Sequence, residues 1–151
     1  MKLNLRTRLY LLPLLALCCT ACEMFETHPY DTHVSGETDI TQRHIDEIET
    51  ALKDKKTFRF AVISDTQRWY DATVDAVEAI NRRNDVDFVL HAGDQADFGA
   101  TQEFMWMRDI LNKLDVPYLT VIGNHDCLGT GCDVYRTLYG ETNFAFTAGN
   151  V

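Results

Sequence analysis

The sequence has 151 residues, a length that suits a single domain. Its 23 acidic side chains outnumber the 14 lysines and arginines, so the formal net charge at pH 7 is −9. This balance argues against nucleic acid and against anionic lipid headgroups as binding partners, because both are negatively charged.

The first 21 residues are predicted to be a signal peptide rather than part of the fold. A basic start precedes an apolar stretch, 9–17, that is too short to span a membrane. The small residues Thr20 and Ala21 then precede Cys22, an order that resembles the cleavage site of a bacterial lipoprotein. We therefore expect a lipid on Cys22. The alternative is an ordinary secretory signal that is cut near Ala21.

A lipid on Cys22 would also set the location of the protein. The chain would lie in the cell envelope, outside the cytoplasm, with the lipid anchor as its contact with the membrane. The sequence leaves open whether it faces the periplasm or the cell surface. Cleavage would remove three of the 14 basic residues and none of the 23 acidic ones, so the mature net charge would be 11 − 23 = −12.

Residues 22–39 are polar and lack an apolar period, which predicts a tether that leads to a domain over 40–151. Within that domain, apolar runs alternate with stretches whose apolar residues recur at helical spacing. Alternating strands and helices of this kind predict an α/β fold with a layered βαβαβ sheet. The expected elements are a helix at 41–52, a strand at 57–64, a helix at 71–83, a strand at 87–91, a helix with Thr101 as its N-cap, a strand at 118–122, a helix at 134–139 and a strand from 143.

Three of the predicted strands end in a polar turn. Asp65 follows the first strand, Asp94 the second and Asn124 the third, at intervals of 29 and 30 residues. A βαβ unit takes roughly 30 residues, so parallel strands would bring these three side chains to one edge of the sheet. Open α/β sheets bind their ligands at that edge.

The residue types in these turns suit a metal site. Clustered carboxylates repel one another unless a cation lies among them. Oxygen donors from Asp, Asn and Gln, with a histidine nitrogen nearby, favour divalent Mn, Fe or Zn, and Mg is a further option. Two such ions about 3.5–4 Å apart can activate water and hold a phosphoryl group for in-line attack. Ordinary polar turns of a Rossmann-like sheet are the alternative interpretation.

Taken together, the three turns resemble those of the calcineurin-like metallophosphoesterase family, over about residues 57–151. The family pattern is D-x-H, then G-D-x-x-D, then G-N-H-[DE]. The sequence has Asp-Thr-Gln at 65–67, Gly-Asp-Gln-Ala-Asp at 93–97 and Gly-Asn-His-Asp at 123–126. The resemblance implies the N-terminal half of the family's α/β sandwich. It also implies an enzyme with two divalent metal ions that hydrolyses phosphate mono- or diesters with a metal-bound hydroxide.

The resemblance assigns a role to each residue of the pattern. Asp65 would bind the first metal ion, Asp94 would bridge both ions, and Asn124 would bind the second. His125 would protonate the leaving group or stabilise the transition state, and a hydrogen bond to Asp97 would orient it.

Gln67 departs from the pattern, which has a histidine at this position. Its amide oxygen can still bind a hard metal ion, but it donates less charge than an imidazole. We therefore expect Gln67 to be a ligand of the first ion, and that site to be weaker or to prefer a different metal.

Two cysteines, Cys127 and Cys132, closely follow the third turn. Outside the cytoplasm such a pair can form a disulfide that closes a small loop. Two free thiols are the alternative.

A second departure from the family is that no histidine follows His125. The family takes further metal ligands from later histidines, including a G-H-x-H turn. We therefore expect this sequence to be an N-terminal part of a longer enzyme, and its activity on its own is left open. The alternative is a non-catalytic envelope binding protein that retains a partial metal site.

Overall fold

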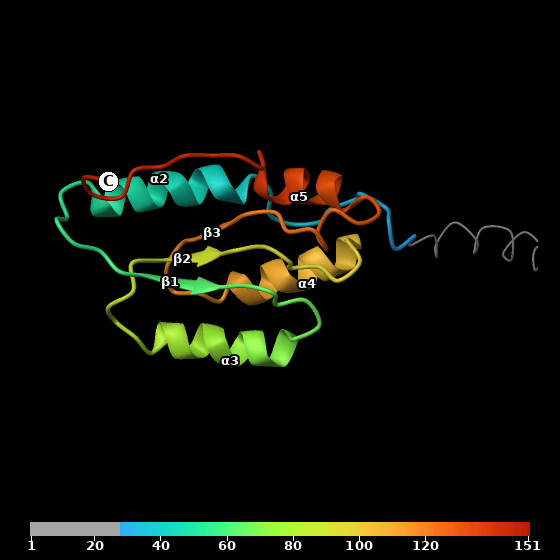
Figure 1. Ribbon diagram of the computed structural model, residues 1–151, viewed down its shortest axis with the longest axis horizontal. Coiled ribbons are helices and arrows are strands. Elements are labelled where there is room, and N and C mark those ends of the chain that lie inside the picture. The colour runs from blue at the N-terminus through green and yellow to red at the C-terminus, as the bar shows by residue number, and fades with distance from the viewer. Residues whose placement is uncertain (1–27) are drawn as a thin grey trace, which may run out of the picture.

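The computed structural model describes residues 28–151, and a three-stranded parallel sheet lies at the centre of this part of the chain. Strands β1 (Phe60–Ile63), β2 (Phe88–His91) and β3 (Tyr118–Thr120) lie in the order β1-β2-β3 (Figure 1). Each connection between them contains a helix, as parallel strands require. The predicted α/β fold with a parallel βαβαβ sheet is therefore confirmed.

Four helices of the described residues pack around this sheet: α2 (Ile40–Leu52), α3 (Tyr70–Asn81), α4 (Thr101–Leu111) and α5 (Gly131–Tyr139). In Figure 1, α2 and α5 lie on one side of the strands and α3 lies on the other, whereas α4 overlaps the ends of the strands in this view. The side chains of α4 share a core cluster with those of α5. Each of these helices was predicted, with ends that differ by a few residues from the observed ones.

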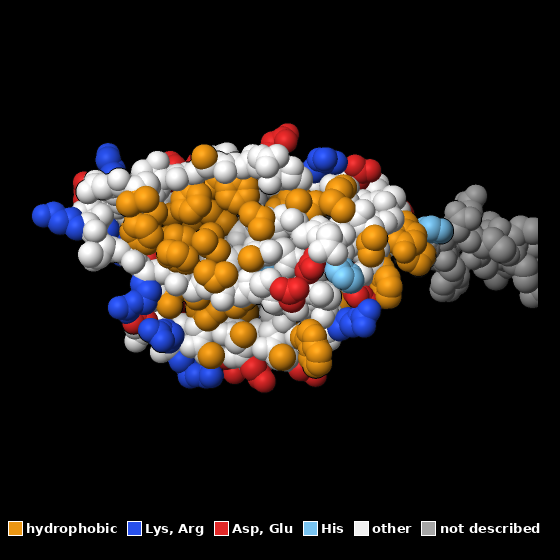
Figure 2. Space-filling view, viewed as in Figure 1, with side chains coloured by type: hydrophobic (Ala, Val, Ile, Leu, Met, Phe, Trp, Pro, Cys, Tyr) orange, Lys and Arg blue, Asp and Glu red, His pale blue; other side chains and the backbone are white. Residues whose placement is uncertain are grey.

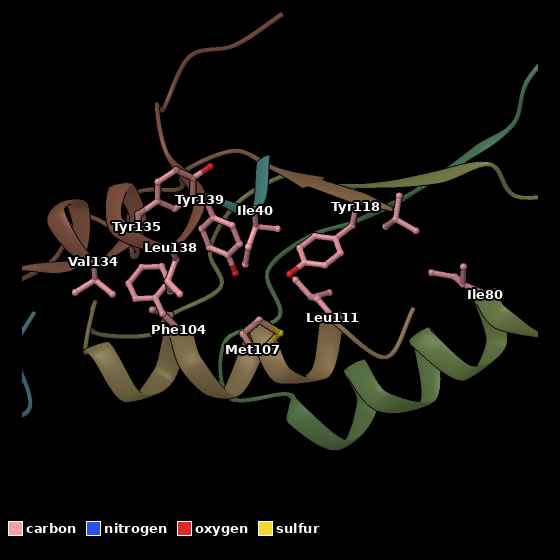
Figure 3. Packing of buried hydrophobic residues seen from close by; sticks show 12 residues of the cluster. Ile40, Ile80, Phe104, Met107, Leu111, Tyr118, Val134, Tyr135, Leu138 and Tyr139 are labelled. Atoms are coloured by element: carbon pink, nitrogen blue, oxygen red, sulfur yellow. The ribbon is translucent and has the colours of Figure 1, made fainter. Parts of the chain in front are cut away.

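Successive residues of a strand point to opposite faces of a sheet, so the apolar residues of these strands form a core on each face. On the face toward α3 and α4, Val89 and Tyr118 belong to a cluster that includes the buried apolar side chains of α4. Figure 3 shows three α4 side chains in this cluster: Phe104 and Met107 point toward side chains of α5, and Leu111 points toward Tyr118 of β3. All three are fully buried, and each stabilises the fold by about 1.5–3 kcal/mol relative to an exposed side chain.

The second core lies on the opposite face, under α2. Phe88 and Leu119 point to this face and pack in one cluster with Leu52 of α2. Because α2 lies over β3, it leaves β1 open on this face, where Phe60 is 45% exposed and Val62 is 59% exposed. Figure 2 shows hydrophobic side chains gathered between α2 and β1.

The strand predicted from residue 143 is wrong, because residues 143–147 form no strand. Phe144 and Phe146 instead pack beside the core under α2, and the backbone N–H of Thr147 donates to Oε1 of Glu49 at 2.9 Å. The alternation of apolar residues in this segment therefore reflects packing against a helix and the sheet face rather than pairing with a strand.

The predicted N-cap of α4 is also wrong. Thr101 is the first residue of the helix, and its hydroxyl donates to the carbonyl oxygen of Asp31. The free N–H groups of Phe98 and Ala100 are satisfied by the Glu103 carboxylate, at 3.0 Å each. The N-cap position is Ala100, which has no side-chain cap, and the first-turn Glu103 reaches back to the backbone N–H groups just before the helix.

Residues 28–39, expected to be part of a tether, lie against the domain instead. The Thr130 hydroxyl donates to the carbonyl oxygen of Tyr30 at 2.9 Å, and Nη1 of the buried Arg108 donates to that of Ser35 at 2.6 Å. These bonds use backbone carbonyls, which every residue offers, so composition alone did not reveal them.

Other predictions about the start of the chain lie outside the described residues. These are the signal peptide over 1–21, the lipid on Cys22 and the first part of the tether. Within residues 28–151, none of the helices is both long and apolar enough to cross a membrane.

Candidate active site

The first two predicted turns are in direct contact at the carboxyl edge of the sheet. The backbone N–H of Asp65 donates to the carbonyl oxygen of Gly93 at 3.1 Å, and that of Gln67 donates to the carbonyl oxygen of Asp94 at 3.2 Å. Asp65 and Asp94 both have a left-handed backbone, with φ of 56° and 59°. Residues other than glycine rarely adopt a left-handed backbone, and those that do are often found at functional sites.

The third turn joins the second through the Asp94 carboxylate. Its Oδ1 accepts a hydrogen bond from the backbone N–H of His125 at 3.0 Å. The approach requires glycine at the end of each strand. A Cβ on Gly93 would lie 2.9 Å from the Cα of Gly123, and one on Gly123 would lie 2.8 Å from Cγ of Asp94. The Gly-Asp and Gly-Asn steps therefore allow the two turns to come together.

Asp126, to which we assigned no role, holds these turns in place. It is fully buried, and its Oδ1 accepts from the backbone N–H groups of Gln95 and Ala96 at 2.8 Å each. Its Oδ2 accepts from those of Asp94 and Gly123 at 2.9 Å each. Burial raises the pKa of Asp126, and the four N–H donors oppose that rise. The acidic fourth position of G-N-H-[DE] was the signal in the sequence for this role.

The amide of Gln67 supports a metal at this edge. Its Oε1 is buried and accepts no hydrogen bond, which is costly for a polar atom unless a ligand meets it. Asp65 and Asn124 present exposed side chains beyond the ends of β1 and β3, and Asp94 is half-buried between them. Figure 2 shows acidic side chains next to a histidine on this part of the surface.

These four side chains offer oxygen donors only, of the kind that hard divalent ions prefer. Two of them, Gln67 and Asn124, are neutral. Within residues 28–151 no group of three or more His, Cys, Asp or Glu side chains is placed to hold a metal ion. The residues therefore fit a part of a two-metal coordination shell and would leave its remaining positions to other ligands.

His125 lies beside Asp97, but the contact differs from the expected one. Nδ1 of His125 is 2.9 Å from the backbone carbonyl oxygen of Asp97, whereas the Asp97 carboxylate is 3.8 Å away. The carbonyl can only accept, so Nδ1 carries a proton and Nε2 remains available for another partner. This hydrogen bond is the main cause of a raised pKa of His125. The Asp97 carboxylate instead accepts from Nε of Arg68 at 2.5 Å.

His91 has a structural role beneath the turns. It is buried, its Nδ1 accepts the backbone N–H of Gly93 at 3.2 Å, and its Nε2 lies 2.8 Å from the hydroxyl of Thr66. Burial lowers the pKa of His91 to about 4. The neutral ring therefore links the first turn to the second.

The structure joins Cys127 and Cys132 in a disulfide, with 4.7 Å between the two Cα atoms. The bond closes a loop between the third turn and α5. The tight packing beneath this loop involves Gly131, where a Cβ would lie 2.8 Å from the Cα of Gly99. The disulfide thus constrains the segment that directly follows His125 and Asp126.

Comparison with known proteins finds sequence similarity to phosphoesterases. A protein of Xenorhabdus bovienii (strain SS-2004), named as a probable cyclic nucleotide phosphodiesterase, is 25% identical over 77 residues. The match covers 51% of this chain and 30% of that relative. The profile of the calcineurin-like phosphoesterases matches residues 58–150, which is more than half of the chain and includes all three turns. The chain therefore belongs to the calcineurin-like phosphoesterase family.

Proposed function

We propose that the protein is a metal-dependent phosphoesterase that hydrolyses phosphate mono- or diesters at the carboxyl edge of the sheet. The observation that carries the proposal is the contact among the three turns, which joins the backbones of Asp65, Gln67 and His125 to the Gly93-Asp94 turn at one edge of the sheet. The buried Oε1 of Gln67, which accepts no hydrogen bond, supports a ligand at this edge. Membership of a phosphoesterase family supports it.

Each of these residues then has a role. Asp65 and Gln67 would hold the first ion, Asn124 the second, and the Asp94 carboxylate would contact both. Bound divalent ions of Mn, Fe, Zn or Mg would supply positive charge for the phosphoryl oxygens and a water molecule of lowered pKa.

His125 would handle the proton of the leaving group. Its Nδ1 is tied to the carbonyl oxygen of Asp97, so the ring presents Nε2. The same hydrogen bond raises the pKa of His125, so the ring keeps its second proton to a higher pH than a free imidazole does. Nε2 would then donate its proton to the oxygen that departs from phosphorus.

The proposed class of substrate is a phosphate ester, and similarity to a protein named as a probable cyclic nucleotide phosphodiesterase favours a diester. The net charge of −9 argues against nucleic acid polymers as substrates or partners. We further propose an envelope location with a lipid anchor on Cys22, on the basis of the sequence order that precedes this cysteine. Mass spectrometry of the mature N-terminus tests this, and an unmodified terminus would contradict it.

A second candidate function is that of a non-catalytic envelope binding protein that retains a partial metal site. It is favoured because, within residues 28–151, no group of three or more His, Cys, Asp or Glu side chains could hold a metal ion. The two candidates differ in turnover: both bind divalent ions, but only the first hydrolyses an ester.

The test is to assay the full chain with p-nitrophenyl phosphate and bis(p-nitrophenyl) phosphate after loading with Mn, Zn, Fe or Mg. We expect turnover that falls to background in Asp94→Asn, which keeps the shape and the hydrogen-bond acceptor of the side chain. The matched control is Asp133→Asn on α5, where the side chain is 70% exposed. Metal binding by calorimetry without any turnover would refute the enzyme and support the second candidate.

A further inference from the structure

Arg68 is held in one position by contacts on two sides. It directly follows Gln67, and its backbone is left-handed, with φ of 67°. Its Nε donates to the Asp97 carboxylate at 2.5 Å, and its Cζ lies 5.7 Å from the centre of the Phe98 ring. The Asp97 side chain is only 6% exposed, so the anchor of this guanidinium is buried. The cation lies on the aromatic face that such groups prefer.

Arg68 nevertheless uses few of its donors. A guanidinium has five N–H groups, and in residues 28–151 the structure shows a hydrogen bond from Nε alone. The contrast is Arg108, which is buried and donates from Nε and both Nη atoms to Asp109 and Ser35. Arg108 is thus a structural arginine, whereas the 66% exposed Arg68 keeps its Nη1 and Nη2 groups for solvent or a ligand.

The position of Arg68 places it in the candidate active site. The Asp97 carboxylate lies between the two basic groups, 2.5 Å from Nε of Arg68 and 3.8 Å from Nδ1 of His125. Arg68 also belongs to the first turn, next to the metal-binding candidate Gln67. A cation with unused donors is therefore joined, through Asp97, to the same residue that His125 contacts at the edge of the sheet.

We propose that Arg68 binds the phosphoryl group of the substrate, with Nη1 and Nη2 donating to its non-bridging oxygens. This inference rests on the proposed function, because it assumes that the ligand of this edge is a phosphate ester. The planar fork of a guanidinium matches two phosphate oxygens, and Nε is already engaged by Asp97. Asp97 and Phe98 would hold the fork in place, which lowers the entropy cost of binding.

The experiment measures phosphate binding and catalysis separately, in the full chain loaded with Mn. Inorganic phosphate is titrated by calorimetry, and KM and kcat are measured with bis(p-nitrophenyl) phosphate, which releases p-nitrophenolate. For Arg68→Gln we expect phosphate affinity to fall roughly tenfold or more and KM to rise by a similar factor, with a smaller change in kcat. Mn affinity should be unchanged. Arg68→Lys should recover part of the phosphate affinity, since it keeps the charge without the fork.

The matched control is Arg136→Gln on α5, whose arginine is similarly exposed and pairs with Asp133. It should leave phosphate binding and KM unchanged. Phosphate affinity within twofold of the wild type in Arg68→Gln would overturn the inference. So would a fall in kcat alone, because that pattern means that Arg68 only positions Asp97. If Arg68→Gln does not fold, the Arg68→Lys titration decides: wild-type phosphate affinity in that variant refutes the two-donor fork.

Failure of the proposed function gives a different result. A wild type that binds phosphate and hydrolyses no ester, together with weaker phosphate binding in Arg68→Gln, would refute the enzyme and keep the anion site. A wild type that hydrolyses esters, with an Arg68→Gln variant of unchanged phosphate affinity and KM, would keep the enzyme and refute the phosphate-binding role of Arg68.

Discussion

Replacement of Asp126 by alanine should cost more stability than any other single change at the sheet edge. The carboxylate is fully buried and accepts four backbone hydrogen bonds at 2.8–2.9 Å, two on each oxygen. Hydrogen bonds to a charged group contribute about 1.5–3 kcal/mol each, and the cost of burying the charge offsets part of their sum. We therefore expect Asp126→Ala to lower the free energy of unfolding by roughly 4 kcal/mol, within a range of about 3–6 kcal/mol.

Asp126→Asn offers a graded version of the same perturbation. It keeps one acceptor oxygen for two of the four N–H groups and turns an amide NH₂ toward the other two. About half of the loss should result, roughly 2 kcal/mol. This variant matters because a domain of this size has a total stability of about 5–15 kcal/mol, and the alanine variant could lose most of it.

The assay is urea unfolding followed by circular dichroism, in the presence of EDTA so that metal binding does not contribute. The midpoint should shift while the m-value stays constant. Asp133→Asn, at an exposed position on α5, is the control and should change the unfolding free energy by less than about 0.5 kcal/mol. A loss below about 1 kcal/mol in Asp126→Ala would refute the reasoning, because the four N–H groups would then find water or other partners without cost.

Three further predictions concern neighbouring residues. Gly123→Ala should lose about 1–3 kcal/mol in urea unfolding and weaken metal binding, because its Cβ would lie 2.8 Å from Cγ of Asp94; unchanged metal affinity would contradict this. Burial in the folded state lowers the pKa of His91 to about 4, from about 6.5 in the unfolded chain. The free energy of unfolding should therefore be highest above pH 6.5 and should fall by about 3 kcal/mol as the pH drops from 6.5 to 4. His91→Gln should show a flatter dependence in EDTA, and an identical pH profile would count against the buried neutral ring. Replacement of Cys127 and Cys132 by serine should lower the unfolding free energy by about 2 kcal/mol, the value for so short a loop, whereas equal melting curves with and without reductant would exclude a stabilising disulfide.

The order of strands and helices was accessible from the sequence because burial imposes a period on it. β1, β2 and β3 are short apolar runs, and the helices between them repeat apolar residues at helical spacing. The same reasoning failed at residues 143–147, where alternating phenylalanines lie against α2 and the sheet face. Period alone does not tell a strand from an extended segment that covers a core.

The sequence was enough to predict which turns meet at the sheet edge, because strand topology determines this. Parallel strands deliver their following residues to one edge, so spacing alone was enough to group Asp65, Asp94 and Asn124. The hydrogen-bond partner of each side chain within the site could not be predicted from the sequence. We expected the Asp97 carboxylate to orient His125, but the backbone carbonyl does so and the carboxylate binds Arg68. Such choices depend on side-chain rotamers and on differences of about 1 Å, which the sequence does not encode locally.

The contacts that hold the turns together lie between protein groups. Backbone bonds join the first turn to the second, and the carboxylates of Asp94 and Asp126 join the second to the third. If these turns carry a metal ion as proposed, their order would not depend on it, in contrast to small metal domains, where metal binding and folding are one event. The free energy of metal binding would then not be spent on ordering the turns and would remain available for holding a phosphoryl group. The same reasoning gives a role to the acidic last position of the third turn: Asp126 fixes the backbone from which the proposed ligands project.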